Sequence, residues 1–398
     1  MFKFKVKSCA ACAGLIMAAF ISLQSCSDND DNDPVLPHNI EVAEISAGGS
    51  ISVTPSSDVK AGETVVLSAT VDEKWSFGGW SVTTTGENST DVEVDDPMAA
   101  QASFIMPDSP VKVDAKFYAP GAEYGLTTVK VPAGTRMLGA EPTEPSYYKD
   151  EKLHEVTISS DFYMSAYETT NAQFADFLNA NKVGEDGKGV WNGTDTELFV
   201  YDSSIRDNGK FNFGVNWNDN KWIPVTGLEN HPVIYVSWYG AAAYAAWVGG
   251  NLPTEAQWEY ACRGGQTEQL PFGIGDGTKM VKGMAQFYIY DYYDLALGGR
   301  KVDETIEGYV SSTYPVGQFD ANGYGLYDMH GNVYEWTLDS YYTYPDTPSV
   351  DPVGPLTGAK RVIRGGGWVN SGRELRTAVR WEQRVGYPME HIGFRVIF

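Results

Sequence analysis

The stretch that decides the fold is Gly323-Tyr-Gly-Leu-Tyr-Asp-Met-His-Gly-Asn-Val-Tyr-Glu-Trp336. Its glycines predict a tight turn, and the residues after them predict a short strand. The same run sets oxygen ligands at close intervals, with Asp328 and Glu335 as its carboxylates. Two further landmarks follow, Arg364-Gly-Gly-Gly-Trp368 and then Gly393-Phe-Arg395. The stretch therefore predicts a turn that leads into a strand and offers hard oxygen atoms to a cation.

The first residues have the features of an export signal. Three lysines precede an apolar stretch from Ala10 to Ile21, which is too short to span a bilayer comfortably. Leu23-Gln-Ser-Cys26 then resembles the lipobox of bacterial lipoproteins, in which the cysteine is acylated. We expect a lipoprotein signal peptide over 1–25 and lipidation of Cys26. An ordinary secretory signal or a short membrane anchor is the alternative.

A polar run follows the cysteine. Residues 26–39 include Ser27-Asp-Asn-Asp-Asp-Asn-Asp33, which cannot pack and predicts a solvated acidic tether. The run resembles the acidic surface-export signal of Bacteroidetes lipoproteins, and a plain spacer is the alternative. We expect an outer membrane lipoprotein, exposed at the cell surface and attached to the membrane through the lipid at Cys26.

Charge and cysteine content restrict the class of protein. The net charge is −23, with no basic stripe to offset it, which disfavours nucleic acid as a partner and suits binding of divalent cations. Of the four cysteines, Cys9 and Cys12 belong to the signal peptide and Cys26 to the lipid anchor. Only Cys262 remains, so no intramolecular disulfide can form. Stability must therefore come from a large apolar core.

Residues 40–118 predict a small all-β module. Gly62 to Thr70 and Val111 to Phe117 alternate in polarity as half-buried strands do, which indicates an antiparallel β domain. The order of turns and strands resembles a bacterial surface repeat of the internalin B-repeat type, which implies a spacer or adhesion module. Trp75 and Trp80 stack on sugar or, as is commoner in so small a domain, belong to its core.

A linker over 119–126 leads to a second domain over 127–398. Capping residues predict helices after Thr170 and Thr254, and an alanine-rich helix extends from Ser237 to Trp247. The rest is rich in loops and short strands. The least regular part, 182–230, is either a functional surface loop or an insertion. It carries Trp191, Trp217 and Trp222.

Seven motifs of the second domain accompany the opening stretch; one of them overlaps it, and the last is the C-terminal motif given above. They are Val131-Pro-Ala-Gly-Thr135, Tyr167-Glu-Thr-Thr-Asn171, His231-Pro-Val-Ile-Tyr-Val-Ser-Trp238, Leu252-Pro-Thr-Glu-Ala-Gln-Trp-Glu-Tyr260, Cys262-Arg-Gly-Gly265, Asn322-Gly-Tyr-Gly325 and Gly393-Phe-Arg395. In this order they resemble the formylglycine-generating enzyme (sulfatase-modifying factor) family. The resemblance covers nearly all of Thr127 to Phe398. It implies an irregular α+β domain that resembles the C-type lectin fold, preceded by the small all-β module.

The resemblance also implies calcium. The positions that ligate one structural calcium in the family are Asp328, Gly331, Val333 and Glu335. Two carboxylates with two backbone carbonyls are a suitable set of hard oxygen ligands. The alternative is that Asp328 caps a turn while Glu335 faces solvent. A second, weaker calcium site would fall at Gln286, Phe287, Glu307 and Tyr309, where an amide replaces the expected asparagine and Glu307 an aspartate.

The catalytic segment departs from the family pattern. The enzymes of the family hold copper(I) on two thiolates, since soft sulfur prefers this ion. The two positions are occupied here by Asn370 and Leu375, neither of which can be a thiolate. Cys262 alone cannot supply two ligands. We therefore expect no copper and no catalytic residues, although the family is one of formylglycine-generating oxidases.

These sequence features support two alternative functions. The favoured hypothesis is a non-catalytic, calcium-stabilised binding or structural protein on the cell surface, with a protein or glycan ligand. Its expected recognition face consists of Trp368, Asn370, Arg373, Arg376, Arg380, Trp381 and His391, together with the aromatic loop at 191–222. The alternative is a formylglycine-generating oxidoreductase that activates sulfatases, or a relative with an altered active site.

Overall fold

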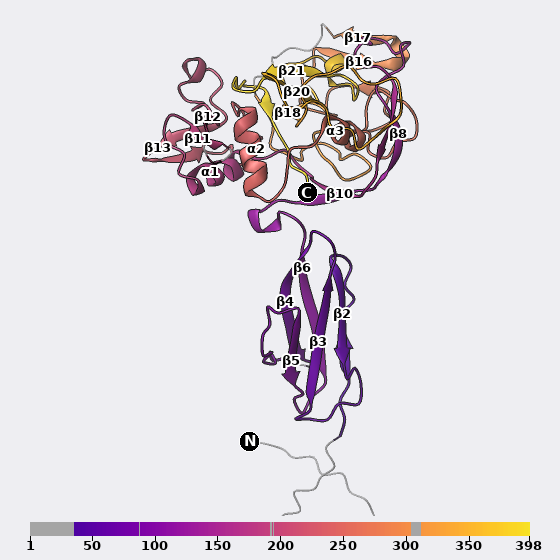
Figure 1. The fold of residues 1–398 in the computed structure, drawn as a ribbon, viewed down its shortest axis with the longest axis vertical. Coiled ribbons are helices and arrows are strands. Elements are labelled where there is room, and N and C mark those ends of the chain that lie inside the picture. Colours follow the sequence, from indigo (N-terminus) through magenta and orange to yellow (C-terminus); the bar gives the residue numbers. More distant parts are fainter. Residues whose placement is uncertain (1–35, 87, 192, 194, 304–311) are drawn as a thin grey trace, which may run out of the picture.

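The computed structural model describes residues 36–86, 88–191, 193, 195–303 and 312–398. The predicted signal peptide, most of the acidic tether and Cys26 lie outside these residues. Figure 1 shows an elongated β module, followed by a larger domain of short strands and few helices. Within the described residues, no helix is both long and apolar enough to cross a bilayer.

The β module consists of two three-stranded sheets that enclose one apolar core. Its strands are β1 (Ile40–Val42), β2 (Gly49–Thr54), β3 (Thr64–Val71), β4 (Ser76–Thr84), β5 (Gln101–Ile105) and β6 (Val111–Tyr118). One sheet has the order β1-β6-β4 and the other β2-β3-β5. The two strands predicted from alternating polarity are confirmed as β3 and β6. The expectation of a wholly antiparallel module is wrong at one pair, because β1 lies parallel to β6.

The two tryptophans of this module have structural positions. Trp80 is buried in the module's core and donates from its indole nitrogen to the carbonyl of Ala99 at 2.9 Å. Trp75 reaches the second domain, where its indole nitrogen donates to the Tyr163 hydroxyl at 2.9 Å. The two rings meet edge to face, with centroids 6.2 Å apart. Trp80 therefore occupies a core position, and Trp75 joins the two domains.

The predicted helices of the second domain are confirmed. They are α1 (Asn171–Ala180), α2 (Trp238–Trp247) and α3 (Glu255–Cys262). Thr170 and Thr254 each form a capping box with the glutamine three residues on, and the Ser237 hydroxyl accepts from the backbone N–H of Gly240. Each cap satisfies backbone donors that the first turn of a helix leaves free.

The remaining elements of this domain are short strands and 3-10 turns. The strands are β7 (Thr128–Val131), β8 (Gly134–Leu138), β9 (His154–Ile158), β10 (Phe162–Ser165), β11 (Lys188–Trp191), β12 (Asp195–Leu198), β13 (Val215–Asn218), β14 (Lys221–Pro224), β15 (Lys279–Met280), β16 (Asp291–Asp294), β17 (Gly299–Val302), β18 (Tyr334–Trp336), β19 (Ser349–Val350), β20 (Lys360–Arg364), β21 (Trp381–Arg384) and β22 (Ile392–Gly393). The 3-10 turns are η1 (Ala122–Tyr124), η2 (Arg206–Gly209), η3 (Leu295–Leu297) and η4 (Gly372–Leu375). The largest sheet of the domain has four strands, in the order β21-β20-β18-β22. The fold is thus the predicted irregular α+β type.

The aromatic segment between α1 and α2 packs onto the domain. It forms two hairpins, β11-β12 and β13-β14, which lie beside α1 and α2 in Figure 1. Trp222 is buried in the core and donates to the carbonyl of Val183 at 3.1 Å. Trp217 meets it edge to face at 5.6 Å, and Trp191 meets Trp238 at 5.5 Å. These rings mainly serve packing, because they have core partners.

Candidate functional site

The opening stretch and the motifs that begin at Arg364 and Gly393 come together at Glu335, in the four-stranded sheet. Glu335 of β18 pairs in register with Arg364 of β20 on one side and with Gly393 of β22 on the other. Before β18, the backbone turns through three left-handed residues, Asp328, Gly331 and Asn332, with φ of 55°, 86° and 58°. A methyl group on Gly331 would lie 2.5 Å from the carbonyl oxygen of Gln286, so this turn requires glycine.

Glu335 is the acceptor in a buried ion pair. Both of its oxygens accept from Arg395, each at 2.7 Å, and the indole of Trp258 donates to Oε2 at 2.8 Å. Arg395 donates in addition to the carbonyls of Ser165, Ala166 and Tyr327. Both charged side chains are buried. The alternative in which Glu335 faces solvent is therefore wrong.

Two further carboxylates lie close to this pair. Asp328 is buried and accepts from the backbone N–H of Gly317 at 2.6 Å. Glu168 is buried as well and accepts from the Asn332 side chain at 2.7 Å and from the Val333 backbone at 3.2 Å. Burial, and then repulsion by Asp328 and Glu335, raises the pKa of Glu168 well above its usual range. Three carboxylates thus face a single guanidinium, that of Arg395.

Asp328 and Glu335 are the two carboxylates of the predicted calcium site. Glu335 Oε1 accepts one hydrogen bond, and so does Asp328 Oδ2, which leaves lone pairs on both carboxylates for a cation. Among the described residues, no three His, Cys, Asp or Glu side chains form a metal-binding group. A cation here would therefore need backbone carbonyl or water oxygens besides the two carboxylates, which is the predicted ligand set. The donor atoms of this set are all oxygens, which is the donor chemistry that suits a hard divalent cation.

The weaker second metal set is described only in part. Gln286 and Phe287 are buried, and the Gln286 side chain donates to the carbonyl of Ser312 at 2.7 Å. The Gln286 carbonyl accepts from the backbone of Asn332 at 2.7 Å, which ties this segment to the first set. Glu307 and Tyr309 lie outside the described residues.

The segment at the positions of the family's copper cysteines, Asn370 to Leu375, is built as a turn. The Asn370 side chain accepts from the backbone of Gly367 at 3.0 Å and donates to Glu374 at 3.3 Å. Glu374 also accepts from the backbone of Ser371 in a capping box that begins η4. Leu375 ends η4 and is buried in an apolar cluster. Asn370 therefore orders the turn and Leu375 fills the core.

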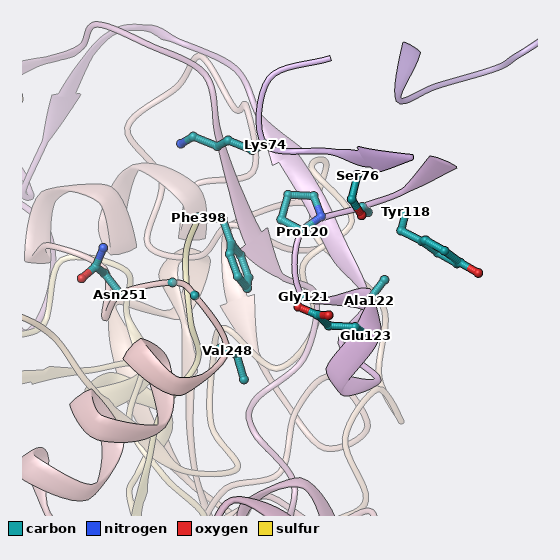
Figure 2. Close-up of a pocket in the computed structure, with 13 residues that line it drawn as sticks. Lys74, Ser76, Tyr118, Pro120, Gly121, Ala122, Glu123, Val248, Asn251 and Phe398 are labelled. Carbon is teal, nitrogen blue, oxygen red and sulfur yellow. The ribbon is translucent and has the colours of Figure 1, made fainter. Parts of the chain in front are cut away.

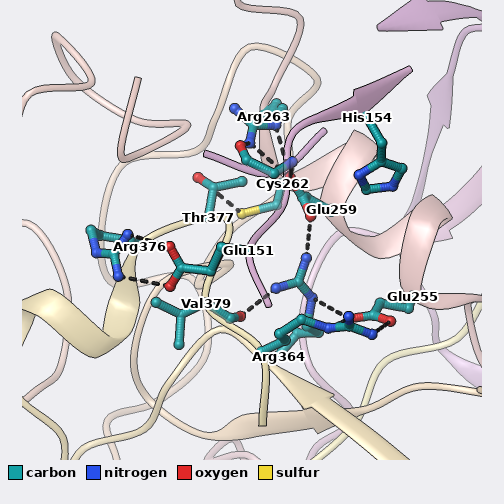
Figure 3. Close-up of polar contacts among 12 residues, drawn as sticks. Glu151, His154, Glu255, Glu259, Cys262, Arg263, Arg364, Arg376, Thr377 and Val379 are labelled. Carbon is teal, nitrogen blue, oxygen red and sulfur yellow. Dashed lines mark hydrogen bonds and ion pairs between the residues drawn. The ribbon is translucent and has the colours of Figure 1, made fainter. Parts of the chain in front are cut away.

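Cys262 is buried in the interior beside Thr377, as Figure 3 shows. Its Sγ atom lies 3.6 Å from His330 Nε2 and 3.9 Å from the Thr377 hydroxyl. Burial raises the pKa of the Cys262 thiol to about 12, so at neutral pH it is protonated. His330 accepts from the backbone of Gly273 through Nε2 and donates from Nδ1 to the Leu375 carbonyl at 2.7 Å. His330 therefore supports the end of η4, and Cys262 packs beside it.

Buried ion pairs account for two of the three arginines of the predicted recognition face, Arg376 and Arg380, and for Arg364 nearby. Figure 3 shows Arg376 against Glu151, with two contacts of 2.8 Å, and Arg364 between Glu255 and Glu259. Arg380 pairs with Glu255 at 2.8 and 2.5 Å. Arg376 and Arg380 are buried, and so is Trp368.

The structure therefore reduces the set of residues that could form the predicted recognition face. Trp368, Arg376 and Arg380 have interior partners and hold the fold. Asn370, Arg373 and His391 are half-buried, and Trp381 is 43% exposed. The seven side chains do not gather on one surface.

One surface hollow unites two of the predicted residues. It has a volume of about 360 Å³ and is lined by Tyr148, Asp150, Tyr341, Arg380, Trp381 and Glu382. We call it the aromatic hollow. The prediction missed four of its residues, because they come from three separate segments. The tyrosines at 341, 342 and 344 were the one local signal of an aromatic surface.

A second cavity lies between the two domains. Figure 2 shows the side chains that line it, among them Lys74 and Tyr118 from the β module and Asn251 and Phe398 from the second domain. Its volume is about 870 Å³. None of the predicted site residues lines it.

Comparison with known proteins decides the family. The family model described as a sulfatase-modifying factor enzyme 1-like domain matches residues 119–398. The chain belongs to the sulfatase-modifying factor family. A model described as a divergent InlB B-repeat domain matches residues 41–120, which agrees with the resemblance of the β module.

The relatives differ in the share of their own length that matches this chain. The chain is 31% identical over 292 residues to formylglycine-generating enzyme of Mus musculus, covering 67% of this chain and 73% of that protein. It is 35% identical over 251 residues to serine/threonine-protein kinase pkn1 of Chlamydia caviae, covering 62% of this chain but 34% of the kinase. The solved structure of PvdO from Pseudomonas aeruginosa is 25% identical, with a TM-score of 0.48, covering 68% of this chain and 93% of that one.

Proposed function

We propose that this member of the sulfatase-modifying factor family is a non-catalytic, calcium-stabilised binding protein of the cell surface. The observation that carries the proposal is the chemistry at positions 370 and 375. The Asn370 amide is engaged in the turn and the Leu375 side chain is buried in the core. The remaining thiol, Cys262, is buried and protonated at neutral pH. No pair of thiolates is therefore available to hold copper(I).

Calcium is part of the proposal because of the charge balance around Arg395. Glu168, Asp328 and Glu335 are buried close to one guanidinium, that of Arg395, and burial raises the pKa of Glu168 well above its usual range and that of Asp328 to about 6. With Glu168 protonated at neutral pH and Glu335 paired with Arg395, Asp328 remains as an excess buried negative charge, which is costly. Asp328 and Glu335, with the carbonyls of Gly331 and Val333, are the residues that would hold the ion. A divalent cation would neutralise this excess and stabilise the turn before β18.

Display at the surface completes the proposal. The lipid at Cys26, with the acidic tether, would hold the chain on the outer membrane, and the β module would set the larger domain away from the bilayer. A Cys26→Ala chain should then leave the membrane fraction and appear in the soluble fraction. Continued fractionation with membranes would refute the anchor.

A copper assay tests the absence of catalysis. The purified chain is incubated with Cu(I) and a peptide that carries Cys-x-Pro-x-Arg, and the mass change of formylglycine is measured. We expect no turnover, with a formylglycine-generating enzyme as the positive control. Copper-dependent turnover would instead support the alternative, a sulfatase-activating oxidoreductase with an altered site.

Thermal denaturation tests the calcium site. We expect a chelator to lower the melting temperature of the wild-type chain, and added calcium to restore it. The Asp328→Ala variant should melt lower and lose its response to calcium. An unchanged melting temperature in the wild type, or an undiminished response in the variant, would remove calcium from the proposal.

A further inference from the structure

The aromatic hollow has the size and the lining of a small-ligand site. Its volume of about 360 Å³ falls within the range of about 300–1,000 Å³ that is usual for such sites. Three of its six residues are aromatic, namely Tyr148, Tyr341 and Trp381. The other three offer polar groups, which is the combination that fixes the orientation of a ligand.

The apolar wall of the hollow is exposed and held in place. Trp381 is 43% exposed at the start of β21, which is the edge strand of the four-stranded sheet. Its ring meets that of Tyr148 at 6.4 Å with an interplanar angle of 66°. The guanidinium of Arg376 lies 5.9 Å from the Tyr148 ring and supports it from the interior. The indole ring of Trp381, held by the edge-to-face contact with Tyr148, thus offers a preformed flat surface to an apolar ligand face.

The charged residues that line the hollow, Arg380, Asp150 and Glu382, determine which charge a ligand can carry. Arg380 lies over the Tyr341 ring at 4.3 Å, and Glu255 already balances its charge, so it offers no counter-ion to an anionic ligand. Glu382 pairs with Lys360 at 2.5 Å, and Asp150 accepts from the Tyr341 hydroxyl. These two carboxylates would repel an anion. Each carboxylate still has lone pairs that can accept from a neutral hydroxyl group.

We infer that the aromatic hollow binds an uncharged sugar ring of a glycan. The C–H face of a pyranose would lie against Trp381, while its hydroxyl groups donate to Asp150 and Glu382. An uncharged polyhydroxyl ligand uses the flat apolar wall and the acceptors together, without separating any existing ion pair. This inference rests on the proposed function, since it names the ligand class of the non-catalytic binding domain.

Titration calorimetry with neutral oligosaccharides tests the inference. The probes are maltohexaose, cellohexaose, mannohexaose and chitohexaose, with dextran sulfate as an anionic comparison and a lysine pentapeptide as a cationic one. We expect the wild-type chain to bind at least one neutral hexasaccharide and neither charged probe. Trp381→Ala should weaken that binding at least about tenfold, the usual effect of truncating a central aromatic contact. Trp381→Phe should retain most of it.

Tyr387→Ala is the matched control. Tyr387 is 46% exposed, close to the value for Trp381, but it does not line the hollow. Its replacement should leave sugar binding unchanged. If Trp381→Ala unfolds, Glu382→Gln reports on the same hollow, because it removes an acceptor charge from an exposed rim residue. Binding to no neutral sugar, binding of a charged probe instead, or equal binding by wild type and the hollow variants would overturn the inference.

Failure of the sugar-binding inference can be distinguished from failure of the proposed function. Copper-dependent turnover in the peptide assay would sink the non-catalytic function whatever the chain binds. No turnover together with no sugar binding would sink only the inference about the hollow. The response to calcium should be the same in the wild type and in Trp381→Ala, because the hollow does not include the residues of the calcium turn.

Discussion

Replacing Glu259 by Gln should destabilise the fold by about 3–5 kcal/mol at pH 7, the usual effect of removing one partner from a buried ion pair. Glu259 is buried in α3, and its two oxygens accept from Arg263, from Arg364 and from the backbone of Gly139. Arg364 is fully buried, and the side chain of Arg263 is 5% exposed. A glutamine has one acceptor oxygen and no charge, so Arg263 would lose its counter-ion and Arg364 would keep only its contact of 3.5 Å with Glu255.

Acid should reduce the difference in unfolding free energy between the wild type and Glu259→Gln. Burial favours the protonated form of Glu259, but attraction by Arg364 and Arg263 and the hydrogen bond from Gly139 outweigh it, so the pKa falls from 4.5 to about 2. A lowered pKa gives stability that is fully present above pH 4.5 and is lost as pH falls toward 2. The shift corresponds to about 3 kcal/mol, of which about 2 kcal/mol is lost by pH 3. The glutamine variant has no such contribution to lose.

Urea denaturation followed by tryptophan fluorescence measures both effects. We expect a gap of about 3–5 kcal/mol between wild type and Glu259→Gln at pH 7, and a gap about 2 kcal/mol narrower at pH 3. Asp161→Asn is the matched control, because it makes the same chemical change in an exposed pair with Lys130. It should not move the midpoint measurably. A gap below about 1 kcal/mol at pH 7, or an equal gap at both pH values, would refute the reasoning.

Three other outcomes follow from single residues. In a chain that begins at residue 27, the Cys262 thiol should not react with a thiol reagent at pH 8 until denaturant is added, because it is buried and has a pKa of about 12. Rapid reaction of the native protein would contradict this. Burial raises the pKa of Asp339 to about 6, so its contribution to stability is lost as pH rises from 4 to 6, and Asp339→Asn should flatten the urea midpoint over that range. Gly331→Ala should lower the melting temperature more than Gly283→Ala. Both glycines have positive φ and the strain costs about 1–2 kcal/mol, but the new methyl meets the Gln286 carbonyl in the first case and open space in the second.

Local chemistry made part of the fold predictable. The side chains of Thr170, Ser237 and Thr254 bind backbone donors within three residues, so the sequence alone locates the three helix starts. Alternation of polarity located β3 and β6 in the same way, since strand period depends on neighbouring residues. The parallel pairing of β1 with β6 joins residues about seventy positions apart, and no local pattern reports it.

The candidate site was less predictable because its partners are distant in sequence. Arg376 and Arg380 were expected at the surface, where isolated arginines usually lie. Their carboxylate partners, Glu151 and Glu255, are 225 and 125 residues away. Trp381 was correctly placed in the exposed part of the chain, but Tyr148 and Tyr341, which complete the hollow, come from other loops.

The position of Glu335 explains why the family motifs persist in a chain without the cysteine pair. Glu335 pairs in register with Arg364 and Gly393, and its carboxylate holds Arg395, so the three landmarks form one buried unit. Loss of any one member would leave a buried charge or an unpaired strand, whatever the chain does chemically. Positions 370 and 375 lie outside that unit, in a turn that Asn370 can order and a core that Leu375 can fill. The motifs are therefore requirements of the fold, and they do not by themselves require the copper chemistry of the family.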